Sequence, residues 1–346
     1  MGSLKRWTLN EYALTPGDAT SVQQLVSIKG LPVDSSHDKI MLTDVYLQRL
    51  TAWQYLTMRF QRHVTFLSGD QLLEPGIPAS ELVAQGFLEM SDSKQNAEVA
   101  AFTALGWKLK ATPTGAVVNG VVTDSPAAKA SIKVADEVVG VNGVPTRTRC
   151  QLEKSVHSLA PGTRLALDVR RARISAAGVI TWKTPSRLWV TTVTPSQSLT
   201  SACANVKGPA RSWLGLSLED GLQYQFPAQV SITTKYIGGP SAGLAMTLSL
   251  IDNLSRGSLT GHHTIAATGT IDRFGNVGDV GGVAQKTVAV ANAGAQYFFV
   301  PRVEVATAEA NAPASLRIVG VTTLSQALRD LRKIGGAQPV PITRPR

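Results

Sequence analysis

The sequence has few of the residues and runs that define several common classes of protein. It contains two cysteines, Cys150 and Cys203, among 346 residues, which is too few for a metal–thiolate site. No apolar run reaches about 18 residues, so we expect no membrane span within it. Aromatic residues make up 6% of the chain, and none interleaves with its basic runs. These scarcities argue against a thiolate metal protein, a transmembrane protein and a nucleic-acid-binding protein, and we expect no metal and no cofactor.

The composition that is present is that of a folded, basic protein. Hydrophobic residues make up 43% of the chain, which is too apolar for disorder, and its length allows two or three domains. Lys and Arg number 34 against 24 Asp and Glu, giving a net charge of +10. The basic residues are spread over separate runs, which is typical of solvated surfaces; attraction to an anionic lipid surface or an acidic partner is the alternative.

Changes in pattern along the chain predict a mixed α/β (α+β) protein with several regions. Residues 1–110 predict an N-terminal α/β region, with one helix over 44–63 and another over 80–107 that is interrupted near Ser91-Asp92-Ser93. Residues 111–198 are rich in β-branched runs and turns, and 212–346 alternate strand and helix patterns. Between them residues 199–211, in a Thr-, Ser-, Pro- and Gly-rich stretch, predict a linker. A disulfide from Cys203 to Cys150 is left open.

The β-rich region resembles a PDZ domain of the kind found in bacterial proteases. The usual sequence motif of that domain is G-S-P-A-A…G-D-x-I-x-x-V-N-G. In this chain residues 124–143 read D-S-P-A-A-K-A-S-I-K-V-A-D-E-V-V-G-V-N-G. Ser131 and Ala135 stand where the pattern has glycine. The resemblance implies binding of extended peptides beside a strand and a helix. We place this groove between Gly115–Val121 and Gln151–Leu159, with the carboxylate-binding loop near residues 113–115. The candidate peptide-binding residues are Gly115, Ala116, Val117 and Val118.

A candidate nucleophile lies in the last third of the chain. Residues 239–243 read G-P-S-A-G, which fits G-x-S-x-G, a pattern that often presents a nucleophilic serine. Ser241 stands where an apolar helix over 241–254 is predicted to begin. Backbone N–H groups at a helix N-terminus are free and suit an oxyanion. We therefore expect Gly239, Ser241 and Ala242 to provide the oxyanion-binding backbone.

The base that would take the serine proton is more plausibly a lysine than a histidine. Of the five histidines only His262 and His263 follow Ser241, and the one acid between, Asp252, is too close for the Ser–acid–His order of an α/β-hydrolase. Lys286 is the only lysine between residues 241 and 300. It lies at the edge of an apolar helical stripe, where burial would favour its neutral form. A surface lysine that extends into solvent, and a Ser-His-Asp esterase that uses His263, are the alternatives.

Two ordered motifs in this region resemble the proteolytic domain of Lon-type serine proteases. One is G-P-S-A-G; the other is T-G-x-I…G-x-V…V-G-G-x-x-x-K, which spans residues 268–286. The resemblance implies Ser241 as nucleophile, Lys286 as general base and Thr268 as the residue that holds the lysine. Many Lon proteins have an Asp three residues before the serine, where this chain has Gly238. No ATPase motif accompanies the domain.

The whole order of regions resembles bacterial PDZ–Lon proteins of the YlbL type. We therefore predict an ATP-independent serine endopeptidase with a Ser-Lys dyad, which cleaves proteins or peptides presented by the PDZ domain. The resemblance implies an N-terminal membrane anchor, absent from this chain, that holds the protein on the extracytoplasmic side of the bacterial cell membrane. No nucleic-acid partner is expected, and a homo-oligomer is left open. The alternative is a peptide-binding scaffold with an inactive or latent Lon-like domain.

Overall fold

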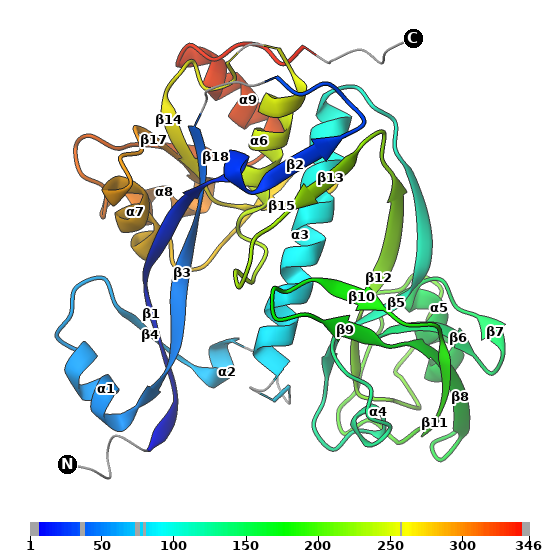
Figure 1. Cartoon of the computed structure of the whole chain (residues 1–346). Helices are drawn as coiled ribbons and strands as arrows, with labels where there is room; N and C mark the ends of the chain where they lie inside the picture. The colour runs from blue at the N-terminus through cyan, green and yellow to red at the C-terminus, as the bar shows by residue number, and fades with distance from the viewer. Residues whose placement is uncertain (1–6, 35–38, 73–76, 79–80, 257, 341–346) are drawn as a thin grey trace. The chain divides into compact units, whose positions relative to one another are not determined.

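The computed structural model describes residues 7–34, 39–72, 77–78, 81–256 and 258–340 (Figure 1). The chain forms two compact units. The first comprises Met1–Gln71, Glu89–Leu109 and Phe226–Arg346, and the second comprises Leu72–Leu88 and Lys110–Gln225. No described helix is both long and apolar enough to cross a membrane.

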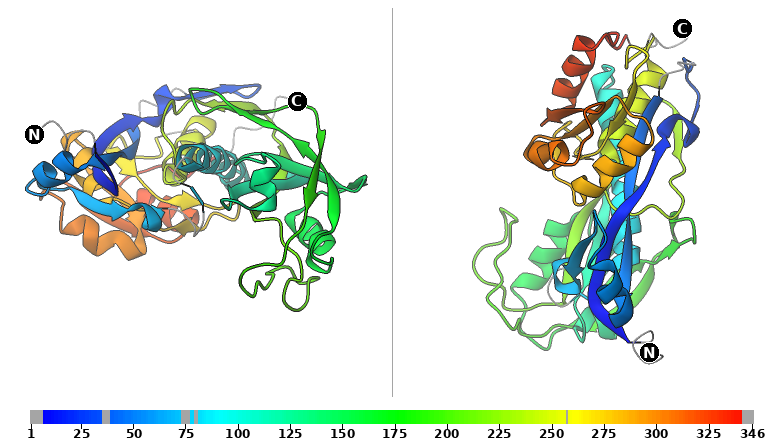
Figure 2. Two further views of the ribbon diagram at one scale, coloured as in Figure 1. Left: turned by 90° about the horizontal axis from the view of Figure 1, so that it is seen from below. Right: turned by 90° about the vertical axis from the view of Figure 1, so that its left-hand side faces the viewer.

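The first unit is built on a six-stranded sheet with the order β18-β17-β14-β3-β1-β4. Its strands are β1 (Thr8–Ser21), β3 (Lys39–Thr51), β4 (Thr65–Ser68), β14 (Thr264–Ala267), β17 (Tyr297–Pro301) and β18 (Arg317–Val321). The first four in that order are mutually parallel, whereas β1 is antiparallel to β3 and β4. Figure 2 shows β1 and β3 running side by side as a long hairpin. Because β3 also pairs with β14, the N-terminal strands complete the sheet of the last third of the chain.

Short elements and helices surround this sheet. The short strand pairs are β2 (Val26–Lys29) with β13 (Gln229–Ile232) and β15 (Thr270–Ile271) with β16 (Val277–Gly278). The helices are α1 (Ala52–Met58), α2 (Gly69–Leu72), α3 (Leu82–Ala104, in this unit from Glu89 onward), α6 (Gly243–Leu254), α7 (Val283–Asn292), α8 (Val305–Glu309) and α9 (Leu324–Lys333), with 3-10 turns η1 (Val22–Gln24) and η3 (Arg302–Glu304).

The sheet is covered by helices on both faces, as the alternation of its side chains requires. Ile40, Ile265 and Phe299 point into a core shared with α3, α6 and α9. Their strand neighbours Met41 and Ala266 point into a second core with α7 and α8. The first unit is therefore a three-layer α/β/α structure, in which α6 and α7 lie on opposite faces of one sheet.

Two predictions about the N-terminal region differ from the structure. Residues 44–51, predicted as helix, are strand, because they pair with β1 along the hairpin. The helix begins only after Thr51, whose hydroxyl accepts a hydrogen bond from the Gln54 N–H in a capping box. Helix α3 is not interrupted, because the Ser93 hydroxyl bonds to the Pro240 carbonyl at 2.9 Å and is buried. The predicted boundaries at 110, 198 and 211 follow chain order, whereas the two units interleave along the chain.

The second unit has a sheet with the order β11-β8-β6-β5-β12 and a core of its own. Its strands are β5 (Lys110–Val121), β6 (Glu137–Val141), β7 (Val144–Pro145), β8 (Arg164–Arg170), β9 (Ala172–Ile174), β10 (Ile180–Trp182), β11 (Ser186–Thr191) and β12 (Leu216–Gln225), and its helices are α4 (Pro126–Lys129) and α5 (Arg149–His157). Ser125 caps α4, and Asn142-Gly143, both at positive φ, form the predicted hairpin turn. Ser131 and Ala135 adopt φ of 58° and 70°, so they take the left-handed conformation that the replaced glycines would favour.

The predicted peptide-binding residues do not lie at a free strand edge. Gly115, Ala116, Val117 and Val118 belong to β5, which pairs with β12 on one side and β6 on the other. A peptide cannot add to a strand whose two edges are already bonded. The described sheet ends at β12, so its outer strand is β12 and not β5. Cys150 and Cys203, whose pairing was left open, are joined by a disulfide.

Candidate active site

Ser241 lies in a tight turn just before α6. The helix begins at Gly243, with Ala242 as its N-cap residue, two residues later than predicted. No described residue accepts a hydrogen bond from the backbone N–H of Gly239, Ser241 or Ala242. Those donors lie at the positive end of a 12-residue helix. The turn therefore has the free donors that an oxyanion would need.

Hydrogen bonds to two successive carbonyls hold this turn in place. The Ser241 carbonyl accepts from the Thr268 hydroxyl at 3.1 Å and from the Gly269 N–H at 2.9 Å. The Pro240 carbonyl accepts from the Ser93 hydroxyl, on α3. A side chain at Gly243 would stand 2.9 Å from Ile271 Cγ2 and 3.1 Å from Ser93 Oγ. The last glycine of G-x-S-x-G thus allows close packing behind the serine.

Lys286 is buried on α7 and bonded to the residue that holds the serine turn. Its side chain is 2% exposed, and Nζ donates to Thr268 Oγ1 at 3.3 Å. Thr268 itself has no exposed surface. Since its one hydroxyl proton goes to the Ser241 carbonyl, its oxygen is free to accept from the lysine. A chain of two hydrogen bonds therefore links Lys286 Nζ to the backbone of Ser241, and no described bond joins Nζ to the Ser241 hydroxyl.

Burial lowers the pKa of Lys286 from 10.5 to about 8. Removal from water disfavours the ammonium form, and the carboxylates of Asp44 and Glu304 oppose that effect by attracting the charge. About a tenth of Lys286 is then neutral at pH 7, and about half at pH 8. A neutral amine can accept a proton from a hydroxyl group, so the site has a chemically competent base.

The sheet topology explains why these groups meet. Thr268 directly follows the carboxyl end of β14, and Glu304 follows that of β17. On the neighbouring parallel strand Met41 pairs with Ala266, so Asp44 lies at the same end. Helices α6 and α7 reach this end from opposite faces. Groups that follow adjacent parallel strands converge at one edge, which is where sites form in α/β sheets.

A β-bulge in β1 accommodates Asp44. The pairing of β1 with β3 shifts between Pro16 and Ala19. In the bulge the Asp18 N–H donates to Asp44 Oδ1 at 2.8 Å. A side chain at Gly17 would lie 2.1 Å from the same oxygen, so this position requires glycine. Burial raises the pKa of the Asp44 carboxyl, and the hydrogen bond donated by the Asp18 backbone N–H partly offsets that effect.

Ser241, Thr268 and Lys286 were predicted as site residues from the sequence, whereas Asp44, Glu304 and Ser93 were not. Asp44 was assigned to a predicted helix, and only its pairing with distant β14 places it here. Asp44 provides a carboxylate that interacts with Lys286, whereas Gly238 stands where many Lon proteins have an acid. The His263 ring is hydrogen-bonded through Nδ1 to the Gln296 side chain. Among the described residues, no hydrogen bond connects the His263 ring to Ser241. The esterase alternative therefore has no geometric support among the described residues.

Comparison with known proteins assigns a class to both units. Residues 103–175 match the PDZ domain model, and residues 233–331 match the Lon protease (S16) C-terminal proteolytic domain. The chain therefore has a PDZ domain followed by a Lon proteolytic domain, the PDZ–Lon arrangement that the motifs predicted, and its mixed α+β fold class is confirmed. Ser241, Thr268, Lys286 and Glu304 lie within the Lon match; Asp44 lies outside it.

Individual relatives resemble one domain or the other. A probable periplasmic serine endoprotease DegP-like of Brucella suis is 33% identical over 102 residues, covering 30% of this chain and 18% of that protein. A Lon protease of Rickettsia felis is 31% identical over 94 residues, covering 26% and 12%. The chain thus spans less than a fifth of the length of these curated relatives. The crystal structure of the PDZ domain of an SdrC-like protein from Listeria monocytogenes matches 32% of this chain and 92% of its own, at 14% identity and a TM-score of 0.24.

Proposed function

We propose that this protein is an ATP-independent serine endopeptidase that uses a Ser241–Lys286 dyad. The observation that carries the proposal is a buried lysine, bonded to Thr268, which in turn bonds to the carbonyl of the candidate nucleophile. The match to the Lon proteolytic domain supports a serine protease. Substrates would be extended or unfolded protein segments, since the chain has no ATPase motif to unfold them.

The proposed reaction has two halves. Neutral Lys286 takes the Ser241 proton while Oγ bonds to the scissile carbonyl carbon, and the oxyanion accepts from the backbone N–H groups of Ser241 and Ala242. As the C–N bond breaks, the lysine ammonium returns that proton to the leaving amine. Water then attacks the acyl-enzyme and gives its proton to Lys286, and the proton returns to Ser241 as the acid product leaves.

Proteolysis of a disordered substrate such as casein, without nucleotide, tests the dyad. Ser241→Ala and Lys286→Met are expected to abolish cleavage, whereas Lys333→Met, at an exposed lysine of α9, should leave it unchanged. The wild-type rate should rise with pH up to an apparent pKa near 8, because only the neutral lysine accepts the proton. Retained cleavage in either dyad variant would refute the proposed mechanism.

The second candidate function is a peptide-binding scaffold whose proteolytic domain is latent. It is favoured by the hydrogen bond of Lys286, which goes to Thr268 and not to the Ser241 hydroxyl. Binding of peptides without turnover, equal in wild type and Ser241→Ala, would support this function over proteolysis. In both cases the PDZ domain would supply the peptide-binding surface.

We further propose an extracytoplasmic location at the cell membrane. The Cys150–Cys203 disulfide supports an oxidising compartment, and one set of relatives carries a periplasmic name. In cells, alkylation of free thiols without reductant should leave both cysteines unmodified. Modification of Cys150 and Cys203 in freshly lysed cells would contradict this location.

A further inference from the structure

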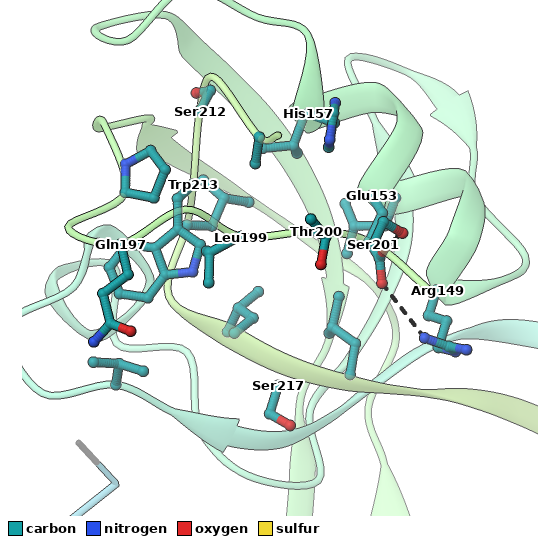
Figure 3. Close-up of a pocket in the computed structure, with 18 of the residues that line it drawn as sticks. Arg149, Glu153, His157, Gln197, Leu199, Thr200, Ser201, Ser212, Trp213 and Ser217 are labelled. Carbon is teal, nitrogen blue, oxygen red and sulfur yellow. Dashed lines mark hydrogen bonds and ion pairs between the residues drawn. The ribbon is translucent and has the colours of Figure 1, made fainter. Parts of the chain in front are cut away.

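A cavity of about 780 Å³ lies within the second unit, beside the edge strand β12 (Figure 3). Helix α5 lines one side with Leu152 and Val156, and β12 lines another with Leu216 and Leu218. Volumes of 300–1,000 Å³ are typical of ligand-binding sites. No described strand pairs with residues 216–218 on the side away from β5. An apolar cavity next to a free strand edge suits an extended peptide that adds to the sheet.

The third side of this cavity is formed by residues 194–212, the disulfide loop. Residues Pro195–Gln197 and Leu199–Ala202 of that loop line the cavity. In Figure 3, Leu199 and Trp213 lie toward one end of the cavity and Arg149 lies toward the other. Most of this loop was predicted as a linker, but it lies beside the cavity between α5 and β12 that a PDZ domain would use.

The disulfide loop is fastened to α5 at both ends of that helix. Cys203 is bonded to Cys150 in the first turn, and the Ser201 hydroxyl donates to the Glu153 carboxylate in the middle. At the last turn the Arg211 N–H donates to the His157 carbonyl at 3.0 Å. The loop therefore follows the helix along its length, and the covalent link is the strongest of these ties.

The disulfide loop lines the cavity but does not occupy its volume. The cavity exists with the loop in place, whereas a loop that blocked the groove would occupy that volume. Leu199 lines the cavity and its side chain is 37% exposed, so it offers apolar surface that a ligand would cover. The charged rim is already engaged, because Arg149 pairs with Glu153 at 3.5 Å and His157 Nε2 lies 3.0 Å from the Gly208 carbonyl. These features favour an uncharged, apolar peptide side chain over an acidic one.

We propose that the disulfide loop is the third wall of the peptide site. Leu199 contacts an apolar side chain of the bound extended peptide, and the Cys150–Cys203 bond keeps this wall in position. Peptide affinity would then depend on the oxidation state of the disulfide. This inference rests on the peptide-binding role proposed for the PDZ domain. It adds a specificity-determining segment outside the strand and helix that form the groove.

The test uses the full chain carrying Ser241→Ala, so that no probe is cleaved. A random decapeptide library displayed on phage is selected against the oxidised protein, and the most enriched peptide is synthesised with fluorescein for anisotropy titration. We expect its affinity to fall at least tenfold when the protein is reduced with a phosphine, and equally in a Cys150→Ser/Cys203→Ser variant. Reduction should not change the affinity of that double variant.

A second variant tests the wall with the disulfide intact. Leu199→Asp should weaken binding at least tenfold, whereas Val144→Asp, at a 66% exposed valine of the β7 hairpin, should not. Unchanged affinity in Leu199→Asp, or tighter binding after reduction, would overturn this inference but leave the proposed peptide binding intact. If no peptide is enriched, the proposed peptide binding fails and this inference fails with it.

Discussion

Replacing Lys286 by methionine is expected to stabilise the protein at neutral pH while it abolishes proteolysis. Burial lowers the pKa of Lys286 from 10.5 to about 8. A difference of about 2.5 pKa units corresponds to about 3 kcal/mol of unfolding free energy that the buried ammonium costs the folded state. Methionine has a similar length and no charge, so the variant avoids that cost and loses one hydrogen bond worth about 1 kcal/mol. The net gain at pH 7 is about 2 kcal/mol.

The dependence on pH separates this effect from ordinary repacking. Below the folded pKa the lysine is charged in both states, and the whole cost is present. Between pH 8 and 10.5 the folded protein has released the proton and the unfolded chain retains it, so wild-type stability rises with pH. The charge cost should therefore fall from about 3 kcal/mol at pH 7 to about 2 at pH 9 and about 1 at pH 10.

Urea unfolding followed by tryptophan fluorescence, at pH 7, 9 and 10, measures this difference. The matched control is Lys333→Met, whose side chain is 75% exposed, and it should change stability by less than about 1 kcal/mol at every pH. A Lys286→Met protein that is less stable than wild type at pH 7, or whose advantage does not shrink with pH, would refute a buried, destabilised ammonium.

Substitutions at three other positions test separate parts of the structure. Asp44→Asn removes a carboxylate that raises the Lys286 pKa, so the pH–rate profile of proteolysis should move to lower pH; a move to higher pH would contradict this role. Thr268→Val should lower kcat about 10- to 100-fold, because an unpaired buried group costs about 1–3 kcal/mol, and Thr268→Ser should retain most activity. Ser131→Gly should raise the free energy of unfolding by about 0.5–1 kcal/mol in urea titration, since Ser131 is exposed at φ 58°; no gain would count against backbone strain there.

Local patterns were sufficient to identify the helices and turns that surround the candidate dyad. Gly239–Gly243 and the apolar stripe of 283–291 are short motifs whose periodicity is visible without tertiary structure. Each indicated a property of one segment: a turn leading into a helix, and a lysine at the edge of an apolar helical face. Both properties are present, since Lys286 is 2% exposed and α6 begins two residues after Ser241. The dyad chemistry itself stays a prediction.

Tertiary structure decided which distant residues join those segments. Strand pairing depends on backbone groups that every residue shares, so neither the register of β3 with β14 nor the position of β12 at the sheet edge can be derived from side-chain types. Pairing with β1 makes residues 44–51 a strand and not the predicted helix, and the pairing of β3 with β14 brings Asp44 to the lysine. In the second unit, the position of β12 at the end of the sheet moves the proposed peptide groove from β5 to β12.

The sequence by itself therefore indicated the residues of the proposed dyad and the local elements that present them, because these depend on motifs and periodicity within a few turns of chain. The electrostatic environment of Lys286 and the wall of the peptide cavity were decided only by the fold. Asp44 is more than 200 positions from Lys286, and the disulfide joins residues 53 positions apart, so the chain carries no local signal for either contact.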